Sequence, residues 1–160
     1  MINLPCERLL VIAGGAADLI ELDKYLTGLR HKVASEIRQV TAAGAGDVRL
    51  ARWAQTVLVL PATADILGMA ANGIAADPVA ALLPAAARPV VFAPAMREDE
   101  RASPAVRHDV DRLRAEGHYV IEPVAGVSLT VELVLTHTMH VVLKQLRDNH
   151  LAEEQLVDHR

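Results

Sequence analysis

Short apolar runs recur along the chain, each closed by small residues or by proline. Such runs are too short for a buried helix, and uninterrupted apolar character is typical of a strand that is covered on both faces. The second run is the least regular, because Val33, Ile37 and Val40 alternate only imperfectly with polar residues. We predict five strands, over 9–13, 33–41, 57–60, 89–93 and 118–122.

The segments between these runs carry apolar residues at helical spacing. Leu19, Leu22 and Leu26 share one stripe in the first of them, and Gly117 is a natural stop for the fourth. We predict helices over 18–30, 47–55, 65–83 with a break at Pro78, 105–116 and 129–147. A charged loop, 98–104, is expected before the fourth helix, and a polar tail, 149–160, after the last.

Strands that alternate with helices predict an α/β domain of Rossmann-like (flavodoxin-like) architecture: an open, mainly parallel sheet with helices on both faces. A chain of 160 residues fits one such domain, which we expect to span 1–148. Ligands of this architecture bind outside the carboxyl ends of the strands. The turns that follow 9–13, 57–60 and 89–93 are therefore the first candidates for a site.

Composition narrows the function classes. A net charge of −4 and the lack of a basic stripe argue against nucleic acid as a partner. The single cysteine, Cys6, excludes an internal disulfide framework and indicates a reducing compartment. The first residues do not read as a signal peptide, and no apolar segment approaches the roughly 20 residues of a membrane helix. A soluble cytoplasmic protein without membrane partners is expected.

Three motifs between positions 50 and 75 are specific. Leu50 begins the letters LARWA, Val57 begins VLVLPATAD, and Ala71 begins ANGIA. They resemble the LARWAD, PASANT and LANGIAD motifs of the homo-oligomeric flavin-containing cysteine decarboxylases. The resemblance extends over roughly 9–123. It implies an FMN cofactor, oxidative decarboxylation of a cysteine, and a site built between the subunits of a homotrimer, which can stack into a homododecamer.

Gly14 and Gly15 follow the first run, where this family reads Thr-Gly-Ser and sets a serine hydroxyl on the FMN phosphate. Glycines let a phosphate approach the backbone N–H groups at a helix start. Ala13 and Gly15 carry no hydroxyl. The resemblance therefore leaves the phosphate to backbone N–H groups and to Thr41. An ordinary strand-to-helix turn is the alternative reading of the two glycines.

The turn after the third run matches the PASANT motif. Thr63 takes its serine position and Asp65 its asparagine position. Ala62 and Ala64 keep the turn thin enough for a flat ring. The resemblance assigns flavin binding to this segment, which starts at Pro61, and gives Asp65 a catalytic role as well. A helix N-cap is the alternative for Asp65, whose ionised side chain accepts hydrogen bonds but donates none, unlike Asn.

Ala95 and Met96 match the PAMN motif after the fourth run, a loop that touches flavin and substrate in the family. The asparagine that holds the substrate carboxylate there is Arg97 here. A guanidinium can hold a carboxylate in a bidentate fork, so Arg97 is the candidate for carboxylate recognition. A core side chain for Met96 and a solvated charged loop for Arg97 are the alternatives.

Asp47 stands where the family has its histidine general base, just before the LARWA motif. Asp47 is accordingly the candidate for proton transfer, with a helix N-cap as the alternative. The family also inserts a further helix and strand before this position, whereas only 44–46 intervene here.

The segment after the last run, 122–128, lacks the cysteine with which phosphopantothenoylcysteine decarboxylases reduce their enethiolate intermediate. Lantibiotic peptide decarboxylases also lack it and release an enethiol. The resemblance therefore favours a peptide with a terminal cysteine as substrate, oxidised to a thioaldehyde that loses carbon dioxide. A phosphopantothenoylcysteine decarboxylase-like enzyme, and a non-catalytic or regulatory member that binds flavin or a partner, are the alternatives.

Two further patterns bear on assembly and on metals. The Ala-rich segment 69–87 is too apolar to be solvated on all sides, which favours oligomerisation independently of the family. His137 and His140 share a helix face, but no third ligand accompanies them at a suitable spacing. No metal site is expected.

Overall fold

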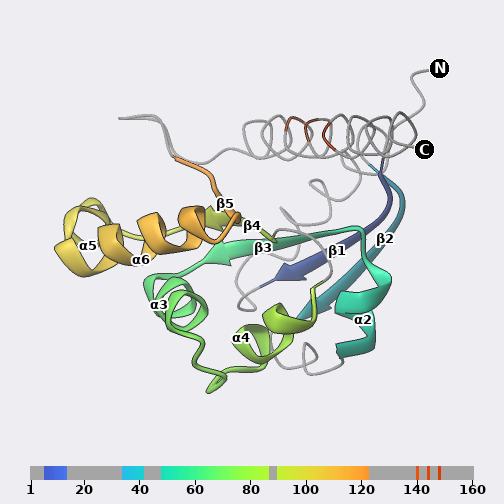
Figure 1. Ribbon diagram of the computed structural model, residues 1–160, viewed down its shortest axis with the longest axis horizontal. Coiled ribbons are helices and arrows are strands. Elements are labelled where there is room, and N and C mark those ends of the chain that lie inside the picture. Colours follow the sequence, from blue (N-terminus) through green and yellow to red (C-terminus); the bar gives the residue numbers. More distant parts are fainter. Residues whose placement is uncertain are drawn as a thin grey trace, which may run out of the picture.

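The computed structural model describes residues 6–13, 34–41, 48–86 and 90–122, with single helical positions at His140, Lys144 and Asp148. Within these ranges, five parallel strands form one sheet in the order β2-β1-β3-β4-β5 (Figure 1). Their bounds are Cys6–Ala13 (β1), Ala34–Thr41 (β2), Thr56–Ala62 (β3), Val90–Pro94 (β4) and Tyr119–Val120 (β5). All five predicted strands are confirmed, with shifted ends.

The strand order reverses between β1 and β3, which are neighbours in the sheet. Ala13, the last residue of β1, pairs with Thr41 of β2 on one side and with Leu60 of β3 on the other. Beyond this level β3 and β4 run on to the pair Ala62 and Pro94. Such a reversal is where open parallel sheets bind ligands, outside the carboxyl ends of the strands.

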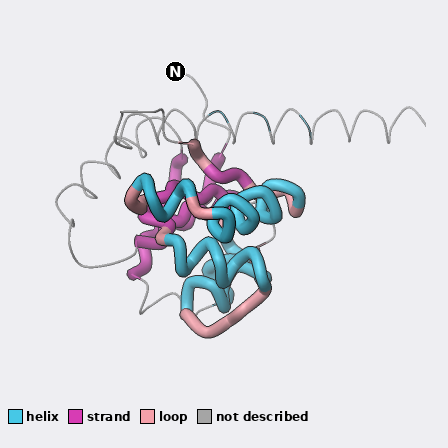
Figure 2. Tube along the Cα trace, turned by 90° about the vertical axis from the view of Figure 1, so that its left-hand side faces the viewer, coloured by secondary structure: helices cyan, strands magenta, loops and turns pink. Residues whose placement is uncertain are grey.

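The described helices pack on one side of the sheet (Figures 1 and 2). They are α2 (Val48–Trp53), α3 (Ala64–Asn72), α4 (Pro78–Leu82), the 3-10 turn η2 (Leu83–Ala85), α5 (Glu98–Ala102) and α6 (Pro104–Ala115). None of these helices is long and apolar enough to cross a membrane. The alternation of strands and helices confirms the flavodoxin-like α/β architecture. The expected helix 18–30, most of the expected helix 129–147 and the tail 149–160 lie outside the described residues.

Helix α3 ends at Gly73, whose φ of 65° is left-handed. The backbone N–H groups of Gly73 and Ile74 donate to carbonyls in the last turn of α3, at 3.4 and 2.9 Å. The predicted helix over 65–83 with a break at Pro78 is therefore correct in the start of a second helix at Pro78 and wrong in continuing the first helix past Asn72. Because the left-handed residue reverses the chain, a new helix, α4, has to begin after Asp77, whose carboxylate caps it.

The expected charged loop over 98–104 is also wrong, because most of it is the helix α5 and the start of α6. The backbone N–H of Arg97 donates to the Glu100 carboxylate (3.1 Å) at the start of α5. Ser103 caps α6 by accepting from the Val106 N–H at 3.3 Å. Acidic residues in a first turn and caps of this kind stabilise helix starts even where no apolar residue marks the helical period.

Aliphatic side chains and Phe92 fill the core between the sheet and these helices. Members of this core with no exposed surface are Ala51, Ala62, Leu67, Leu82, Val90 and Phe92. The LARWA motif contributes Ala51 to this core, with Trp53 packed against it. Two of the family-like motifs thus have a structural role, since Asn72 of ANGIA joins α3 to α6 by donating to Asp109 Oδ1 at 3.2 Å.

His118 joins the start of β4 to the segment before β5. Its Nδ1 accepts a hydrogen bond from the Val90 N–H at 3.1 Å, and its ring meets Phe92 edge-on with centroids 5.9 Å apart. Burial lowers the pKa of His118 from its ordinary value, and the nearby Glu116 carboxylate opposes this with a smaller effect. An Nδ1 that accepts a hydrogen bond is unprotonated, so the neutral ring is the form that fits this position.

Candidate functional site

The loops that follow β3 and β4 are held together by their backbones. The Ala95 N–H donates to the Ala62 carbonyl oxygen at 3.1 Å, directly beyond the pairing of Ala62 with Pro94. Ala62 is fully buried and Ala95 is exposed. The PATAD and PAM segments, distant in sequence, therefore form one continuous rim of small side chains at the carboxyl edge of the sheet.

Thr63 starts helix α3. Its hydroxyl oxygen accepts a hydrogen bond from the Ile66 N–H at 3.3 Å, and its carbonyl accepts from the Leu67 N–H at 3.0 Å. Thr63 is thus the N-cap, and the alternative reading of Asp65 as the N-cap is wrong. Asp65 lies in the first turn with an exposed side chain, where a carboxylate interacts favourably with the helix dipole. The Thr63 hydroxyl proton remains available to donate to a ligand.

Met96 and Arg97 differ in what they contact. Met96 is half-buried and packs against the core cluster. Arg97 is exposed and makes a bidentate fork with its neighbour Asp99, from Nε to Oδ1 at 3.0 Å and from Nη2 to Oδ2 at 2.8 Å. The guanidinium that the sequence marks for a carboxylate is thus already paired with one from its own chain.

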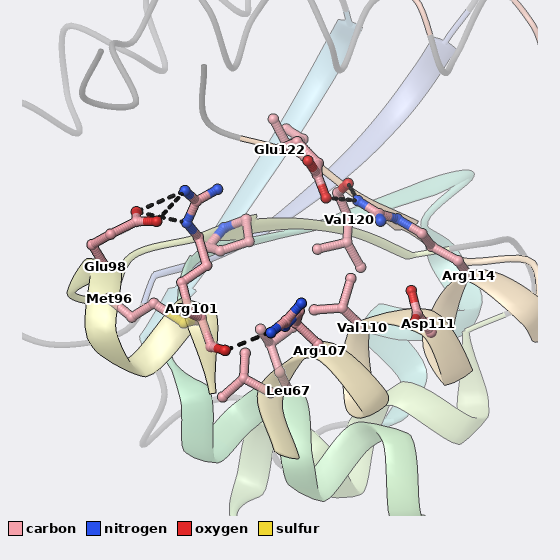
Figure 3. A pocket seen from close by; sticks show the side chains of 14 residues that line it. Leu67, Met96, Glu98, Arg101, Arg107, Val110, Asp111, Arg114, Val120 and Glu122 are labelled. Atoms are coloured by element: carbon pink, nitrogen blue, oxygen red, sulfur yellow. Dashed lines mark hydrogen bonds and ion pairs between the residues drawn. The ribbon is translucent and has the colours of Figure 1, made fainter. Parts of the chain in front are cut away.

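A cavity of about 390 Å³ lies beside Met96, between α3, α5, α6 and the end of β5 (Figure 3). Its apolar lining consists of Leu67, Met96, Val106, Val110, Val120 and Ile121, with Pro94 and Ala102. Its charged lining consists of Glu98, Arg101, Arg107, Asp111, Arg114 and Glu122. The cavity therefore joins an apolar floor to a ring of charges, as small-molecule and peptide sites do.

Two of the three cavity arginines are neutralised by carboxylates. Arg101 forks Glu98, with Nη2 to Oε1 at 2.7 Å and Nε to Oε2 at 3.0 Å. Arg114 donates to Glu122 and to the Val120 carbonyl, both at 3.0 Å. Arg107 donates from Nε to the Ala102 carbonyl at 3.2 Å and has no carboxylate partner within the described part of the chain.

The structure brings some of the candidate residues together, and other candidates lie outside the residues that it describes. Pro61, Ala62, Thr63, Ala64 and Asp65 form one continuous segment next to Ala95 and Met96. Thr41 ends β2 and is level with the end of β1. Gly14, Gly15 and Asp47 lie outside the described residues, as does His137. In the described ranges, no cluster of three potential metal-ligating side chains occurs.

The charged lining of the cavity was not identified from the sequence. A signal was available, since Arg107, Asp111 and Arg114 recur at the three- and four-residue spacing that sets side chains on one face of a helix. Surface helices carry such charges as a rule, so the spacing alone does not separate a binding face from a solvated one. Val120 and Glu122 line the same cavity but come from a segment outside α6, so the spacing along α6 does not predict their proximity.

Comparison with known proteins gives the family. A family model described as Flavoprotein matches residues 6–145. The coenzyme A biosynthesis bifunctional protein CoaBC of Bacillus subtilis (strain 168) is 37% identical over 98 residues, 61% of this chain and 24% of that protein. The mersacidin decarboxylase of Bacillus sp. (strain HIL-Y85/54728) is 40% identical over 77 residues, 48% of this chain and 40% of the relative.

This chain thus spans about a quarter of the length of CoaBC and two-fifths of the length of the mersacidin decarboxylase. Among solved structures, the crystal structure of the FMN-dependent cysteine decarboxylase SpaF has a TM-score of 0.64 and 32% sequence identity, with 75% of this chain and 86% of SpaF covered. A family match over most of the chain, with a structural match over most of its length, leads to one conclusion: the chain belongs to the flavoprotein family.

Proposed function

We propose that this protein is an FMN-dependent oxidative decarboxylase that acts on a cysteine at the C-terminus of a peptide. Family membership and the similarity to a mersacidin decarboxylase and to SpaF support the reaction class. The observation that carries the proposal is the hydrogen bond from the Ala95 N–H to the Ala62 carbonyl at 3.1 Å. It joins the two motifs to which the family resemblance assigns flavin contacts.

The residues at this rim fit a planar cofactor ring. Alanines at 62, 64 and 95 leave the rim thin, and the Thr63 hydroxyl can donate to a ring carbonyl or nitrogen. For the phosphate we propose Gly14, Gly15 and Thr41, because Thr41 closes β2 beside the end of β1. When bound, FMN would supply the oxidant that takes up two electrons as the cysteine thiol becomes a thioaldehyde.

The residues of this chain would orient the substrate and manage its protons. Met96 gives an apolar contact next to the rim, and its half-buried position limits the access of water. We propose Asp47 as the base that accepts the thiol proton, on its match to the family's histidine position. Asp65, exposed in the first turn of α3, would accept a hydrogen bond from cofactor or substrate.

Absorbance spectroscopy and mass spectrometry together test this proposal. Purified protein reloaded with FMN should show the flavin bands and should convert a peptide ending in cysteine to a product lighter by carbon dioxide and two hydrogens. No such product from a varied peptide panel, with flavin bound, would contradict catalysis and favour a flavin-binding role without chemistry. A colourless protein that cannot be reloaded would contradict the cofactor as well.

Matched variants test the rim itself. Ala95→Phe adds a large ring at an exposed position of the proposed slot and should abolish flavin absorbance without unfolding the chain. Ala81→Phe makes the same change at an exposed alanine of α4 and should leave the absorbance unaltered. Equal flavin loading in both variants would show that the ring does not lie against Ala95.

A further inference from the structure

One of the arginines that line the cavity beside Met96 has no carboxylate partner among the described residues. Arg101 forms an ion pair with Glu98, and Arg114 forms one with Glu122. Both carboxylates line the same cavity. Arg107 instead binds a neutral carbonyl through Nε at 3.2 Å, and its terminal NH₂ groups make no hydrogen bond within the described ranges. Figure 3 shows this guanidinium reaching into the space between Arg101 and Val110. Arg107 is therefore the cavity's uncommitted donor.

The contact with the Ala102 carbonyl orients the Arg107 side chain. A guanidinium bonded through Nε keeps its end-on fork, which its two terminal nitrogens form, for a carboxylate. Leu67 and Val110 line the same space with apolar surface. Apolar surroundings lower the local dielectric and strengthen a charge-assisted hydrogen bond made there.

Arg107 is better placed than Arg97 to meet a substrate at the rim. Met96 belongs both to the loop after β4 and to the cavity wall, so the cavity opens directly beside the proposed cofactor slot. Arg97, by contrast, is not part of that wall and already holds the Asp99 carboxylate at 2.8 Å. A substrate carboxylate would have to displace Asp99 before Arg97 could bind it.

We propose that Arg107 binds the terminal carboxylate of the cysteine substrate in the cavity beside Met96. This inference rests on the proposed function and names the residue that recognises the substrate's end. Asp111, one turn further along α6 in the same wall, repels an anion. The carboxylate therefore binds at the Met96 end of the cavity, and the preceding residues of the peptide extend past Asp111.

A pair of unreactive peptides tests the inference without turnover. Serine replaces the terminal cysteine, and each peptide is made as the free acid and as the C-terminal amide. Binding of the fluorescently labelled peptides is measured by anisotropy on the FMN-loaded protein. We expect the wild-type protein to prefer the acid, and Arg107→Gln to weaken acid binding by about tenfold or more with little effect on the amide.

Two variants serve as comparisons, and circular dichroism checks the folding of each. Arg112 is on the same helix as Arg107, but it pairs with Glu116 and does not line the cavity. Arg112→Gln should therefore keep the preference for the acid. Arg97→Gln should also keep it. Loss of the preference in Arg97→Gln with retention in Arg107→Gln would overturn the inference. Equal binding of acid and amide by the wild-type protein, or no binding of either, would overturn it too.

The reaction and the recognition can fail separately. Decarboxylation of cysteine peptides that is unchanged in Arg107→Gln, with an unchanged acid preference, would contradict the assignment of Arg107 and leave the proposed function intact. An acid preference that depends on Arg107, without any loss of carbon dioxide from cysteine peptides, would support the assignment and contradict the reaction.

Discussion

The Ala95 backbone N–H donates a hydrogen bond to the carbonyl oxygen of Ala62, at 3.1 Å. This bond extends the pairing of β3 with β4 past the last paired residues of the two strands. Because it uses main-chain atoms, it does not depend on a polar side chain in either loop. The position of the rim therefore depends on the backbone pairing of the sheet. The side chains that it offers to a ligand are those of the residues that follow, Thr63 on one loop and Met96 on the other.

Thr63 is expected to contribute to stability through its cap. Thr63→Ala removes the oxygen that accepts from the Ile66 N–H, and it should lower the free energy of unfolding by about 1 kcal/mol. Thr63→Ser keeps the oxygen and should retain most of the stability that Thr63→Ala loses. Urea denaturation of the apo-protein measures both. Equal destabilisation by Ala and Ser would indicate that the methyl group, and not the cap, carries the effect.

The same two variants separate folding from cofactor binding. If the Thr63 hydroxyl also donates to bound FMN, Thr63→Ala should weaken FMN binding when measured by flavin fluorescence at a temperature where the apo-variant is fully folded. Thr63→Ser should bind FMN nearly as the wild type does. Unchanged FMN affinity in Thr63→Ala would limit this residue to its structural role.

Strands β3 and β4 could be predicted from the sequence because each is a run of mostly buried apolar residues. Val57–Leu60 and the VVF letters at 90–92 have no polar interruption, and parallel strands covered on both faces have this pattern. The end of β3 was harder to predict. The small residues that follow Leu60 predict a turn that starts at Pro61, yet Pro61 and Ala62 continue the strand, with a shifted register before Ala62.

The helix errors have one cause in common. Hydrophobic periodicity over 65–83 continues across Gly73, so the pattern did not register the left-handed residue that ends α3. Over 98–102 a helix is present where no hydrophobic periodicity predicts one, because α5 contains no buried residue. In both places the chain follows local backbone and capping preferences, which a pattern of apolar positions does not record.

The candidate site could be predicted only where a motif is contiguous. Thr63, Ala95 and Met96 are candidates because they directly follow apolar runs and match family motifs there. The proposed role of Arg107 does not follow from the sequence, because it depends on carboxylates and apolar residues brought to it from other elements. Ion pairs such as Arg114 with Glu122 join positions whose proximity follows only from the docking of α6 on the sheet.

Gly73 gives a prediction that depends on backbone conformation alone. No atom lies within 4 Å of a Cβ added at this position, so the cost of a side chain there comes from the φ of 65°. Gly73→Ala should lower the free energy of unfolding by about 1 kcal/mol, and Gly73→Asn should cost less, since Asn tolerates the left-handed region. Urea denaturation checks both. A neutral Gly73→Ala would mean that α3 ends differently in solution.

Assembly is expected from the family resemblance and from the apolar segment after α3, where Ile74 is half exposed. Light scattering of the purified protein should give the mass of a trimer or of a dodecamer. Ile74→Asp sets a charge on this exposed position, and it should reduce the mass if the segment is part of the subunit contact. A monomeric wild-type protein at micromolar concentration would contradict both the assembly and a site shared between subunits.

His118 should make the stability of the protein depend on pH. Because burial lowers its pKa in the folded state, the unfolded chain binds the proton first as the pH falls. The stabilisation is thus fully present above the unfolded pKa of about 6.5 and is lost as the pH falls from there through the lower folded pKa. Thermal or urea unfolding measured between pH 8 and roughly pH 5 should show this loss.

Asparagine at position 118 isolates the effect. Its Oδ1 can accept the hydrogen bond from the Val90 N–H, as Nδ1 does, but it does not titrate. His118→Asn should therefore be less stable than the wild type at pH 8, since the edge contact with Phe92 is lost, and the difference should shrink as the pH falls. His108→Asn changes an exposed histidine of α6 and should keep the wild-type profile.

Glu116 provides the opposite test. Its carboxylate raises the pKa of His118 and so offsets part of the effect of burial. Glu116→Gln should lower the folded pKa further, which widens the pH range over which stability is lost and deepens the total loss. A profile that narrows in Glu116→Gln, or one that persists unchanged in His118→Asn, would mean that another group controls the acid sensitivity.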